Sequence, residues 1–523
     1  MQFPARFNLA EYFLDSNLAA GRAGKVALHV GDEVRTYGRI AERSARLAAV
    51  LRRAGVRPEE RVLLVLPDGF EFAESFFGVL RAGAVFAMVN PLLKQEEYRY
   101  YLEYSKARVV IAHASTLPEL GPAFEGARFA QTLLVVGPSS EFTGFEQALA
   151  AEDPQSELAR VEPTGPDDLA GWLFTSGSTG KPKACTHRHR DFAYSTETYA
   201  QKVVGYCESD VTLSVPKLFF GYATGTNLMF PFRVGASAVL FEGRATADEL
   251  FDQIAAHRPT LLTSVPTMIN NMLRSERMEH ADLSSLRVTL SAGEALPSAL
   301  LREWQERAGV EVLDGIGSAE MFHIYISNHP GDVRPGSLGR VVEGYEARIV
   351  DTQGAPVPDG EPGRLAVRGG STAICYWGDR EKTVATFAGE WCTSADIFRR
   401  DGEGYYYYEG RADDLLKCAG LWVSPAEIED ALLAHAAVAE VCVVGHEEGD
   451  GLVKPLAFVV PRAGHTPGPA LADALKAHLK SRLAPHKYPR WFRWCAELPK
   501  NDRGKVARME LKASLASGSG ADT

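Results

Sequence analysis

The fold and chemistry of this chain are decided by Thr175-Ser-Gly-Ser-Thr-Gly-Lys-Pro-Lys183, which follows the short apolar run Trp172-Leu-Phe174. The apolar run predicts a strand, and the residues after it predict a loop. Glycines let a backbone turn its N–H groups toward one point, while hydroxyls and lysines add donors and positive charge. The groups concerned are Thr175, Ser176, Gly177, Ser178, Thr179, Gly180, Lys181 and Lys183. This combination predicts a loop that binds a polyphosphate.

The loop is not a Walker A motif, although both are rich in glycine and lysine. A Walker A loop ends in Gly-Lys-Ser/Thr and opens a helix. Here Pro182 follows Lys181 and disfavours helical backbone at that lysine. A flexible surface loop is the alternative interpretation, because Gly/Ser-rich stretches are common in turns. The lysines and the preceding strand favour phosphate binding.

Composition sets the class of protein. A chain of 523 residues is too long for one hydrophobic core, so we expect two or more domains. The net charge of −11 argues against nucleic acid as the main partner. The seven cysteines are widely spaced and form no C-x-x-C pair, which predicts a reducing compartment and neither zinc nor disulfides. With no signal peptide and no membrane-spanning run, we expect a cytoplasmic enzyme.

Strands alternate with helices through the first part of the chain, which predicts an α/β fold with parallel βαβ units. Strands are expected at Arg61–Leu66, Ala84–Val89, Val109–Ala112, Thr132–Val136, Thr260–Val265, Arg287–Ser291 and Val310–Leu313, and helices at Ala41–Ala54, Phe70–Arg81 and Pro297–Ala308. Ligands of such sheets bind beyond the carboxyl ends of the strands. We expect the loop, Ser291–Glu294 and Asp314–Glu320 to lie there.

The pattern changes after about Gly336. Ala347–Asp351, Gly363–Arg368 and Tyr405–Tyr408 are typical of antiparallel strands in a small barrel. A smaller unit follows, with helices expected at Ser424–Leu433 and Leu471–Leu483 and strands at Val438–Val444 and Leu456–Val460. We place a domain boundary at Arg411–Asp414. The expected fold is a large N-terminal domain, residues 1–411, of parallel-rich sheets, helices and a small β-barrel, and a small mobile α+β C-terminal domain, residues 412–523.

Further motifs follow the loop in a fixed order. They are Pro216-Lys-Leu-Phe-Phe-Gly-Tyr222, Ser291-Ala-Gly-Glu294, Asp314–Glu320, Trp391-Cys-Thr-Ser-Ala-Asp396, Gly410-Arg-Ala-Asp-Asp414 with Lys417 and Gly420, and Pro499-Lys-Asn-Asp-Arg-Gly-Lys505. With these motifs, most of the chain resembles the adenylate-forming superfamily of acyl- and aryl-CoA ligases, adenylation domains and firefly luciferase. Lys217–Tyr222 and Asp314–Met321 are most similar to the benzoate-CoA ligase branch, with its aminobenzoate-CoA ligases.

The resemblance implies a reaction in two steps with ATP, Mg²⁺ and coenzyme A. A carboxylate attacks the α-phosphate of ATP to give an acyl-AMP and pyrophosphate, and a thiol then displaces AMP. The first step brings two anions together, so cations and N–H donors must offset their repulsion. Lys505 is expected to bridge the carboxylate and the α-phosphate, whereas a lone lysine near a terminus is ordinarily solvated.

The resemblance also assigns an ATP site. The loop holds the β- and γ-phosphates, Glu320 holds Mg²⁺, Asp396 accepts from the ribose hydroxyls, and Arg411 binds ribose or phosphate. Adenine is expected against Ala292, Gly293, Glu294, Asp314 and Gly315, and the expected ATP site also includes Ile316, Gly317 and Ser318. Taken alone, Glu320 is a surface carboxylate, Asp396 a turn or cap residue and Arg411 an ion-pair partner. The chain departs from the family at Ala319, where a threonine usually contacts the α-phosphate; Ser318 or water is the expected substitute.

The acid pocket is expected to be aromatic and small-residue in character, which suits a flat ring. Its expected members are Phe220, Gly221, Tyr222, Ala223, Gly225, Gly315, Ile316, His323 and Ile324. None of them is acidic, as an amino-acid-activating domain would need near an ammonium. His323 is expected to contact the carboxylate or a ring substituent, and a purely structural histidine is the alternative.

The resemblance implies that the C-terminal domain rotates between the two steps about Asp413. After rotation, Lys417, Gly420, Leu421 and Trp422 are expected to line the tunnel for coenzyme A. We therefore expect an aryl-CoA ligase that activates benzoate, 2-aminobenzoate or a hydroxybenzoate, as a monomer or homodimer that binds neither nucleic acid nor membrane. The alternatives are a stand-alone adenylation enzyme that loads a carrier protein and a non-catalytic nucleotide sensor.

Overall fold

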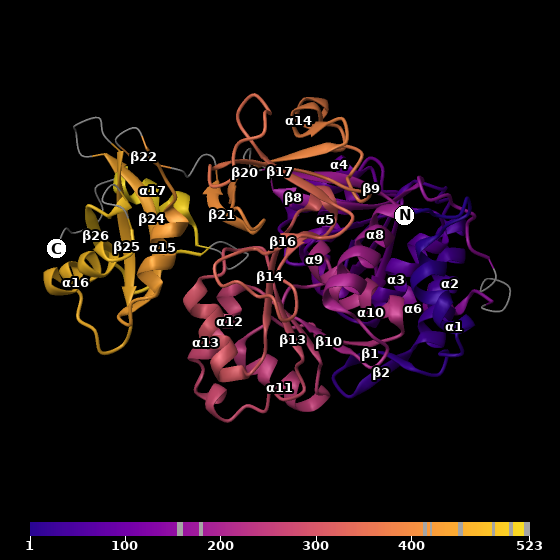
Figure 1. Cartoon of the computed structure of the whole chain (residues 1–523). Coiled ribbons are helices and arrows are strands. Elements are labelled where there is room, and N and C mark those ends of the chain that lie inside the picture. Colours follow the sequence, from indigo (N-terminus) through magenta and orange to yellow (C-terminus); the bar gives the residue numbers. More distant parts are fainter. Residues whose placement is uncertain are drawn as a thin grey trace.

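The computed structural model describes residues 1–153, 160–176, 181–411, 416–418, 421–447, 453–483, 487–500 and 506–516. Two large sheets with their helices form most of the molecule (Figure 1). A smaller antiparallel sheet, drawn in orange, lies next to them. The C-terminal strands and helices, drawn in yellow, form a separate group beside β21 and α13.

The first large sheet carries the loop at its edge. Its strand order is β7 (Thr143–Gly144), β6 (Thr132–Val136), β5 (Val109–His113), β3 (Arg61–Val65), β4 (Val85–Met88), β8 (Leu169–Ser176) and β9 (Pro182–Arg188). All neighbouring pairs are parallel except β8 and β9, which are antiparallel. The central strands are buried along almost their whole length, as expected for a parallel sheet covered on both faces.

The second large sheet carries the other predicted ligand-binding segments. Its order is β16 (Arg340–Val341), β15 (Ile324–Ser327), β14 (Val312–Gly317), β13 (Val288–Ser291), β12 (Leu261–Ser264), β10 (Val211–Ser214), β11 (Ser237–Leu240), β1 (Val26–Val30) and β2 (Glu33–Thr36). The inner strands β14, β13, β12, β10, β11 and β1 are parallel, whereas β15, β16 and β2 are antiparallel to their neighbours.

Helices cover both sheets. The longer ones are α2 (Tyr37–Arg53), α3 (Phe70–Arg81), α4 (Gln95–Ser105), α5 (Leu117–Glu125), α11 (Ala247–His257), α12 (Pro266–Arg274) and α13 (Ser298–Ala308). Shorter ones are α1 (Ser16–Ala19), α6 (Phe145–Ala150), α8 (His189–Ser195), α9 (Gly221–Thr224), α10 (Phe230–Val234) and α14 (Arg380–Thr386). Residues of α2, α3 and both sheets belong to one cluster of buried apolar side chains.

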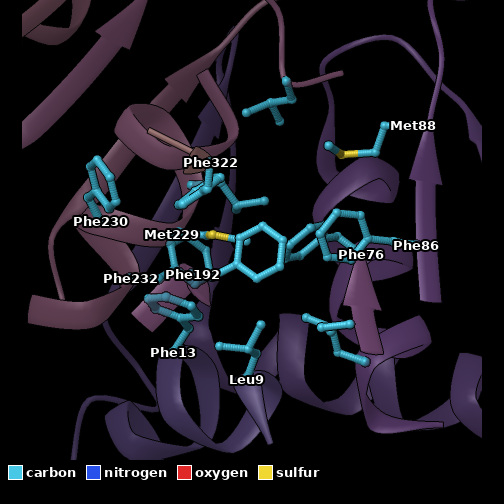
Figure 2. Close-up of a cluster of buried hydrophobic side chains, with 14 of the residues drawn as sticks. Leu9, Phe13, Phe76, Phe86, Met88, Phe192, Met229, Phe230, Phe232 and Phe322 are labelled. Carbon is cyan, nitrogen blue, oxygen red and sulfur yellow. The ribbon is translucent and has the colours of Figure 1, made fainter. Parts of the chain in front are cut away.

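Aromatic rings from distant segments fill this cluster (Figure 2). Phe76 and Phe86 come from α3 and β4, and their ring centroids lie 4.5 Å apart. Phe192 of α8 continues the row, 5.4 Å from Phe86 and 4.5 Å from Phe322. A continuous apolar contact therefore joins the first sheet to the segment that carries Glu320.

The smaller sheet and the C-terminal group complete the fold. The smaller sheet contains β17 (Glu346–Val350), β18 (Gly363–Arg368), β19 (Phe387–Ala388), β20 (Trp391–Arg400) and β21 (Tyr406–Arg411), all in antiparallel pairs. Across the described strands, no ladder closes this sheet into the barrel that was predicted. The C-terminal group contains β22 (Leu416–Cys418), β23 (Leu421–Val423), β24 (Val438–Glu447), β25 (Val453–Pro461), β26 (Trp491–Trp494), α15 (Pro425–Leu433), α16 (Pro469–Lys480) and α17 (Arg508–Ala516).

No described helix combines the length and apolarity that crossing a bilayer requires. All seven cysteines are free thiols.

We predict that Gly171→Ala destabilises the strand that leads to the loop. Gly171 lies opposite Phe86, and an added Cβ would stand 2.1 Å from the Phe86 Cζ. Because Phe86 is fully buried, the ring has no free space to enter, and overpacking of this kind costs about 1–3 kcal/mol. Thermal unfolding should show a lower melting temperature. Gly243→Ala, where nothing lies within 4 Å of the new Cβ, should leave it unchanged; equal melting temperatures for the two variants would contradict the argument.

Candidate active site

The predicted phosphate loop connects two antiparallel strands. Thr175 pairs with Lys183 and Ser176 with Pro182, so the loop closes a hairpin between β8 and β9. A Walker A loop opens a helix instead, so the two geometries differ. Gly177, Ser178, Thr179 and Gly180 lie outside the described residues, and the side chain of Ser176 is not described.

Two tyrosines of α4 hold the strand that leaves the loop. The Tyr100 hydroxyl donates to the carbonyl of Pro182 at 2.5 Å. The Tyr104 hydroxyl accepts from the N–H of Ala184 at 3.2 Å and donates to the carbonyl of Trp377 at 2.6 Å. The two rings stack with centroids 5.4 Å apart, and Lys181 Nζ lies 5.8 Å from the Tyr100 centroid. Sequence reasoning missed both tyrosines, although their spacing of four residues places them on one helix face.

Two hydrogen bonds to Glu320 and one to its neighbour Ala319 hold this part of the chain. It lies in a short 3₁₀ turn, Ala319–Met321. The Ala373 N–H donates to its carbonyl at 2.8 Å, and the Tyr376 hydroxyl donates to its Oε1 at 2.6 Å. One residue earlier, His187 Nε2 donates to the carbonyl of Ala319 at 2.7 Å. The Glu320 carboxylate is therefore held in position before any ligand binds.

The ring of Tyr376 brings two predicted site residues together. Lys183 Nζ lies 3.6 Å from the centroid of this ring, whose hydroxyl contacts Glu320. A cation and a carboxylate thus meet at one buried aromatic side chain. Burial and the nearby Glu320 raise the pKa of Tyr376, so its hydroxyl stays protonated and acts as a donor.

The residues present fit a magnesium ion bound together with a nucleotide. Within the described ranges, no group of three or more His, Cys, Asp or Glu side chains is arranged to hold a metal. Mg²⁺ is commonly held by one or two carboxylates, with phosphate and water oxygens completing its shell. Glu320 is such a carboxylate. Ala319 offers no side-chain donor, and Ser318 beside it lies against Tyr325.

The predicted ribose residues face each other across a ladder. Asp396 of β20 and Arg411 of β21 are paired in register. Asp396 is half-buried, and its N–H donates to Ser394 Oγ at 2.8 Å. The side chain of Arg411 is not described.

The predicted adenine segments follow β13 and lie within β14. Glu294 Oε2 accepts from the N–H and hydroxyl of Thr267, at 3.1 and 2.8 Å, and so caps the start of α12. Asp314–Gly317 were expected beyond the strand, but β14 extends through Gly317 and pairs with β15. At Gly315 a Cβ would stand 2.7 Å from the carbonyl oxygen of Ile326, so the close approach of β15 also requires this glycine.

Asp314 is a buried carboxyl group. It is 4% exposed, and burial raises its pKa to about 8. The Ser291 hydroxyl and the Gly315 N–H beside it offset this increase in pKa only in part. The group is therefore largely neutral at pH 7 and adds little negative charge to the site.

Several of the residues predicted to form the acid pocket lie close to His323. Phe220 precedes α9, which contains Gly221, Tyr222 and Ala223, and Gly225 opens the next turn. His323 Nε2 contacts the Tyr222 carbonyl at 3.1 Å, and a Cβ on Gly225 would stand 2.5 Å from His323 Cδ2. Glycine thus makes room for the imidazole. Ile324 begins β15 directly after it, and Ile316 of β14 pairs with Ile326.

The protonation of His323 limits what it can bind. Burial lowers its pKa to about 3, so the ring is neutral at pH 7. Because a carbonyl only accepts, Nε2 carries the proton and Nδ1 is a bare acceptor. Nδ1 has no partner within the described part of the chain. An acceptor does not bind a carboxylate, so of the two predicted contacts the ring substituent is the one that this geometry favours.

Phe322 turns the chain between Glu320 and His323. Its φ of 66° is positive, which is uncommon for a residue other than glycine. Its ring packs against Phe192 in the core (Figure 2). The strained residue thus separates the predicted metal ligand from the acid pocket.

A buried aspartate positions the segment that precedes the pocket. Asp68 Oδ1 accepts from the N–H of Leu218 at 2.7 Å, while Lys217 Nζ donates to the carbonyl of Phe241 at 2.6 Å. Burial raises the pKa of Asp68 to about 6 and lowers that of Lys217 to about 8. Asp68 follows β3, and its position at the carboxyl end of a strand is the signal that could have identified it.

Comparisons with known proteins agree with this geometry. The AMP-binding enzyme family matches residues 16–377, and the AMP-binding enzyme C-terminal domain matches residues 427–505. The chain belongs to the AMP-binding enzyme family. This confirms the predicted adenylate-forming superfamily and an ATP-dependent, AMP-forming ligase that uses Mg²⁺ and coenzyme A.

Similar members of the family act on aromatic acids. The chain is 42% identical to the benzoate–CoA ligase of Thauera aromatica over 98% of this chain and 97% of that one. It is 41% identical to the 4-hydroxybenzoate–CoA/benzoate–CoA ligase of Rhodopseudomonas palustris, covering 97% and 94%. The solved anthranilate CoA ligase AuaEII in complex with anthranoyl-AMP aligns with a TM-score of 0.94 at 38% identity, covering 99% and 100%.

The predicted coenzyme A segment of this AMP-binding enzyme is a short hairpin. Lys417 in β22 pairs with Trp422 in β23, next to Leu421. The side chains of these residues are not described, and Asp413, Gly420 and Lys505 lie outside the described residues.

The C-terminal group contacts the ends of α12 and α13. Ser298 N–H donates to Asp430 Oδ1 at 2.8 Å, and its hydroxyl lies 3.2 Å from both carboxylate oxygens. Arg274 donates to the carbonyl of Ala439 and lies 4.0 Å from Glu440. These described contacts between the C-terminal group and the helices are polar.

We predict that Asp314→Asn changes how stability depends on pH. An acid with a pKa near 3.9 unfolded and about 8 folded binds more protons in the folded state between those values. Stability of the native protein should therefore fall as pH rises from 4 to 8, by up to about 1.4 kcal/mol per pH unit. Asparagine does not titrate and removes this contribution.

Between pH 5 and 8, the melting temperature of Asp314→Asn should rise relative to that of the native protein as pH increases. The exposed carboxylate Asp473 of α16 provides a control, Asp473→Asn, which should follow the native curve. Parallel curves for the native protein and Asp314→Asn would show that Asp314 is ionised in the folded state.

Proposed function

We propose that this AMP-binding enzyme is an aryl-CoA ligase. It converts benzoate or a substituted benzoate, with ATP, to aryl-AMP and pyrophosphate, and then transfers the aryl group to coenzyme A with release of AMP. The observation that carries the proposal is the cluster of Tyr222, Gly225 and the buried His323, which lies three residues along the chain from Glu320. The names of the similar enzymes support an aromatic acid.

The contacts of Glu320 and Lys183 with Tyr376 support the following ATP roles. The hairpin loop with Lys181 and Lys183 binds the β- and γ-phosphates, Glu320 binds Mg²⁺, and Asp396 accepts from the ribose. The backbone of Ala292–Glu294 contacts adenine. Lys505 reaches the α-phosphate and the acid in the first step and stabilises the charge that develops between them.

Residues 1–411 and 412–523 act as two domains that change their relative orientation between the steps. Asp413 is the hinge, and Lys417, Gly420, Leu421 and Trp422 contact the pantetheine arm after rotation. The free thiols of the chain support a reducing, cytoplasmic location. The enzyme acts as a monomer or homodimer.

A panel of benzoates tests this function. Benzoate, 2-amino-, 2-, 3- and 4-hydroxybenzoate and an aliphatic acid of similar size are offered separately, with AMP release measured with and without coenzyme A. Aromatic acids should support AMP release that depends on coenzyme A. Transfer to a phosphopantetheinyl carrier protein but not to coenzyme A would indicate the carrier-loading alternative. Pyrophosphate release at background level with every acid would favour a nucleotide sensor.

We predict that Lys505→Ala abolishes aryl-AMP formation but spares thioester formation from supplied aryl-AMP. The ammonium serves the first step, and losing one such group costs about 10²–10³ in rate. Pyrophosphate exchange measures the first step and thioester formation the second. Lys500→Ala is the matched control, because Lys500 pairs with Glu440 at 3.2 Å outside the predicted site. An equal loss in both steps would assign Lys505 a structural role.

We predict that Asp413→Pro holds the enzyme in the orientation that forms aryl-AMP. Proline fixes φ near −65°, which prevents the backbone change at the hinge. Quenched-flow analysis should detect aryl-AMP without aryl-CoA. Asp413→Ala, which leaves φ free, should form both products. Native levels of aryl-CoA from the proline variant would exclude Asp413 as the hinge.

A further inference from the structure

The two oxygens of the Glu320 carboxylate are not equivalent. Oε1 accepts the Tyr376 hydroxyl at 2.6 Å, whereas no hydrogen bond from the described residues reaches Oε2. One of the two acceptor sites of Oε1 is therefore used by Tyr376, and Oε2 is the oxygen that a metal ion can approach without competing with this hydroxyl.

Tyr376 is itself held rigidly. Its residue is 3% exposed, its backbone forms a bridge with Cys185, and its N–H donates to Thr383 Oγ1 at 3.1 Å. Phe387 packs against the ring with centroids 5.3 Å apart, and Lys183 Nζ lies over it. The hydroxyl therefore cannot leave Glu320 without disturbing the strand that follows the phosphate loop.

Divalent cations differ in how they use a carboxylate. Mg²⁺ is small, requires near-octahedral geometry and binds carboxylates through single oxygens. Ca²⁺ is larger, takes six to eight oxygens and readily binds both oxygens of one carboxylate. A carboxylate with one oxygen in a fixed hydrogen bond binds a metal more readily through its other oxygen alone, which suits the first ion better than the second.

We propose that Tyr376 is a positioning residue that determines the metal preference of this site. Its hydroxyl keeps Glu320 bound to the metal through one oxygen, so the site favours Mg²⁺ over Ca²⁺. This inference rests on the proposed role of Glu320 as the Mg²⁺ ligand. It adds Tyr376 as a residue that orients Glu320. It also explains the contact between Lys183 and Tyr376, because the same ring then orients both the lysine that follows the phosphate loop and the metal ligand.

The test is Tyr376→Phe, which removes the hydroxyl and keeps the ring with its contacts to Phe387 and Lys183. Binding of Mg²⁺ and Ca²⁺ is measured by calorimetry in the presence of a non-hydrolysable ATP analogue, and inhibition by Ca²⁺ is measured at fixed Mg²⁺. Partners that orient a metal ligand change metal affinity by about 10–100-fold when removed. We expect Mg²⁺ binding to weaken about 10-fold while Ca²⁺ binding is retained or tightened.

Tyr345→Phe is the matched control, since this buried tyrosine bonds to Ser195 and Ser371 at 2.8 Å and not to Glu320. It should leave the Ca²⁺/Mg²⁺ affinity ratio unchanged. This ratio does not depend on how much of a variant is folded, so partial misfolding of Tyr376→Phe does not obscure the result.

Glu320→Gln distinguishes the proposed role of Glu320 as the Mg²⁺ ligand from the proposed role of Tyr376 in metal preference. If Glu320→Gln weakens Mg²⁺ binding and Tyr376→Phe leaves the affinity ratio at the native value, Tyr376 does not select the metal and the inference is overturned. If Glu320→Gln leaves Mg²⁺ binding unchanged, the proposed role of Glu320 fails, and the inference fails with it. A higher Ca²⁺/Mg²⁺ ratio in Tyr376→Phe alone supports the inference.

Discussion

Repulsion between two anions is the constraint on which this site depends. An aryl carboxylate must come within bonding distance of a phosphate, and two unit charges about 4 Å apart interact by about 4 kcal/mol at the dielectric typical of protein surfaces. The chain as a whole is acidic, with a net charge of −11. Positive charge is nevertheless concentrated at the loop, through Lys181 and Lys183. The proposed Lys505 adds to it only when the C-terminal domain approaches.

Burial removes negative charge where it would oppose the reaction. Asp314 and Asp68 both lie next to predicted ligand-binding segments, and burial raises their pKa values to about 8 and about 6. The Asp314 carboxyl is therefore mostly neutral near the pocket, and Asp68 is offset by Lys217 and the Leu218 N–H. Glu320 differs from both, because it is half-buried and available to a cation. These three carboxyl groups thus differ in burial and in charge because their surroundings differ.

Sequence patterns predicted the helices and strands whose apolar residues follow a regular spacing within the element itself. Helix α3 was predicted with the bounds that it has, and strands β3, β5, β6, β13 and β18 within about two residues of theirs. Strand β9 was missed because Pro182 and Lys183 carry a turn-like signal, and only pairing with β8 makes them extended. The barrel was inferred from antiparallel strands, but closure depends on ladders that no single strand encodes.

The same distinction holds for the site. Motifs predicted ATP-binding roles for Glu320, Asp396 and the loop, because these residue types in this order are recognisable from sequence alone. Tyr100, Tyr376 and Asp68 act only through contacts with residues far along the chain, so their roles could not be inferred from local sequence. The structure brings Lys183 and Glu320 to one ring and leaves His323 in a different environment, on the apolar side of Phe322.

The left-handed backbone at Phe322 has a consequence for how this enzyme tolerates change. Such a conformation costs roughly 1–3 kcal/mol and persists only where surrounding packing enforces it. Here the enforcement comes from the aromatic row that reaches back through Phe192 to Phe86. Phe322 therefore belongs both to the hydrophobic core, through its ring, and to the Glu320 turn, through its backbone. Substitutions that repack this interior and relax the φ of Phe322 would therefore move the Glu320 turn relative to His323 while the protein stayed folded.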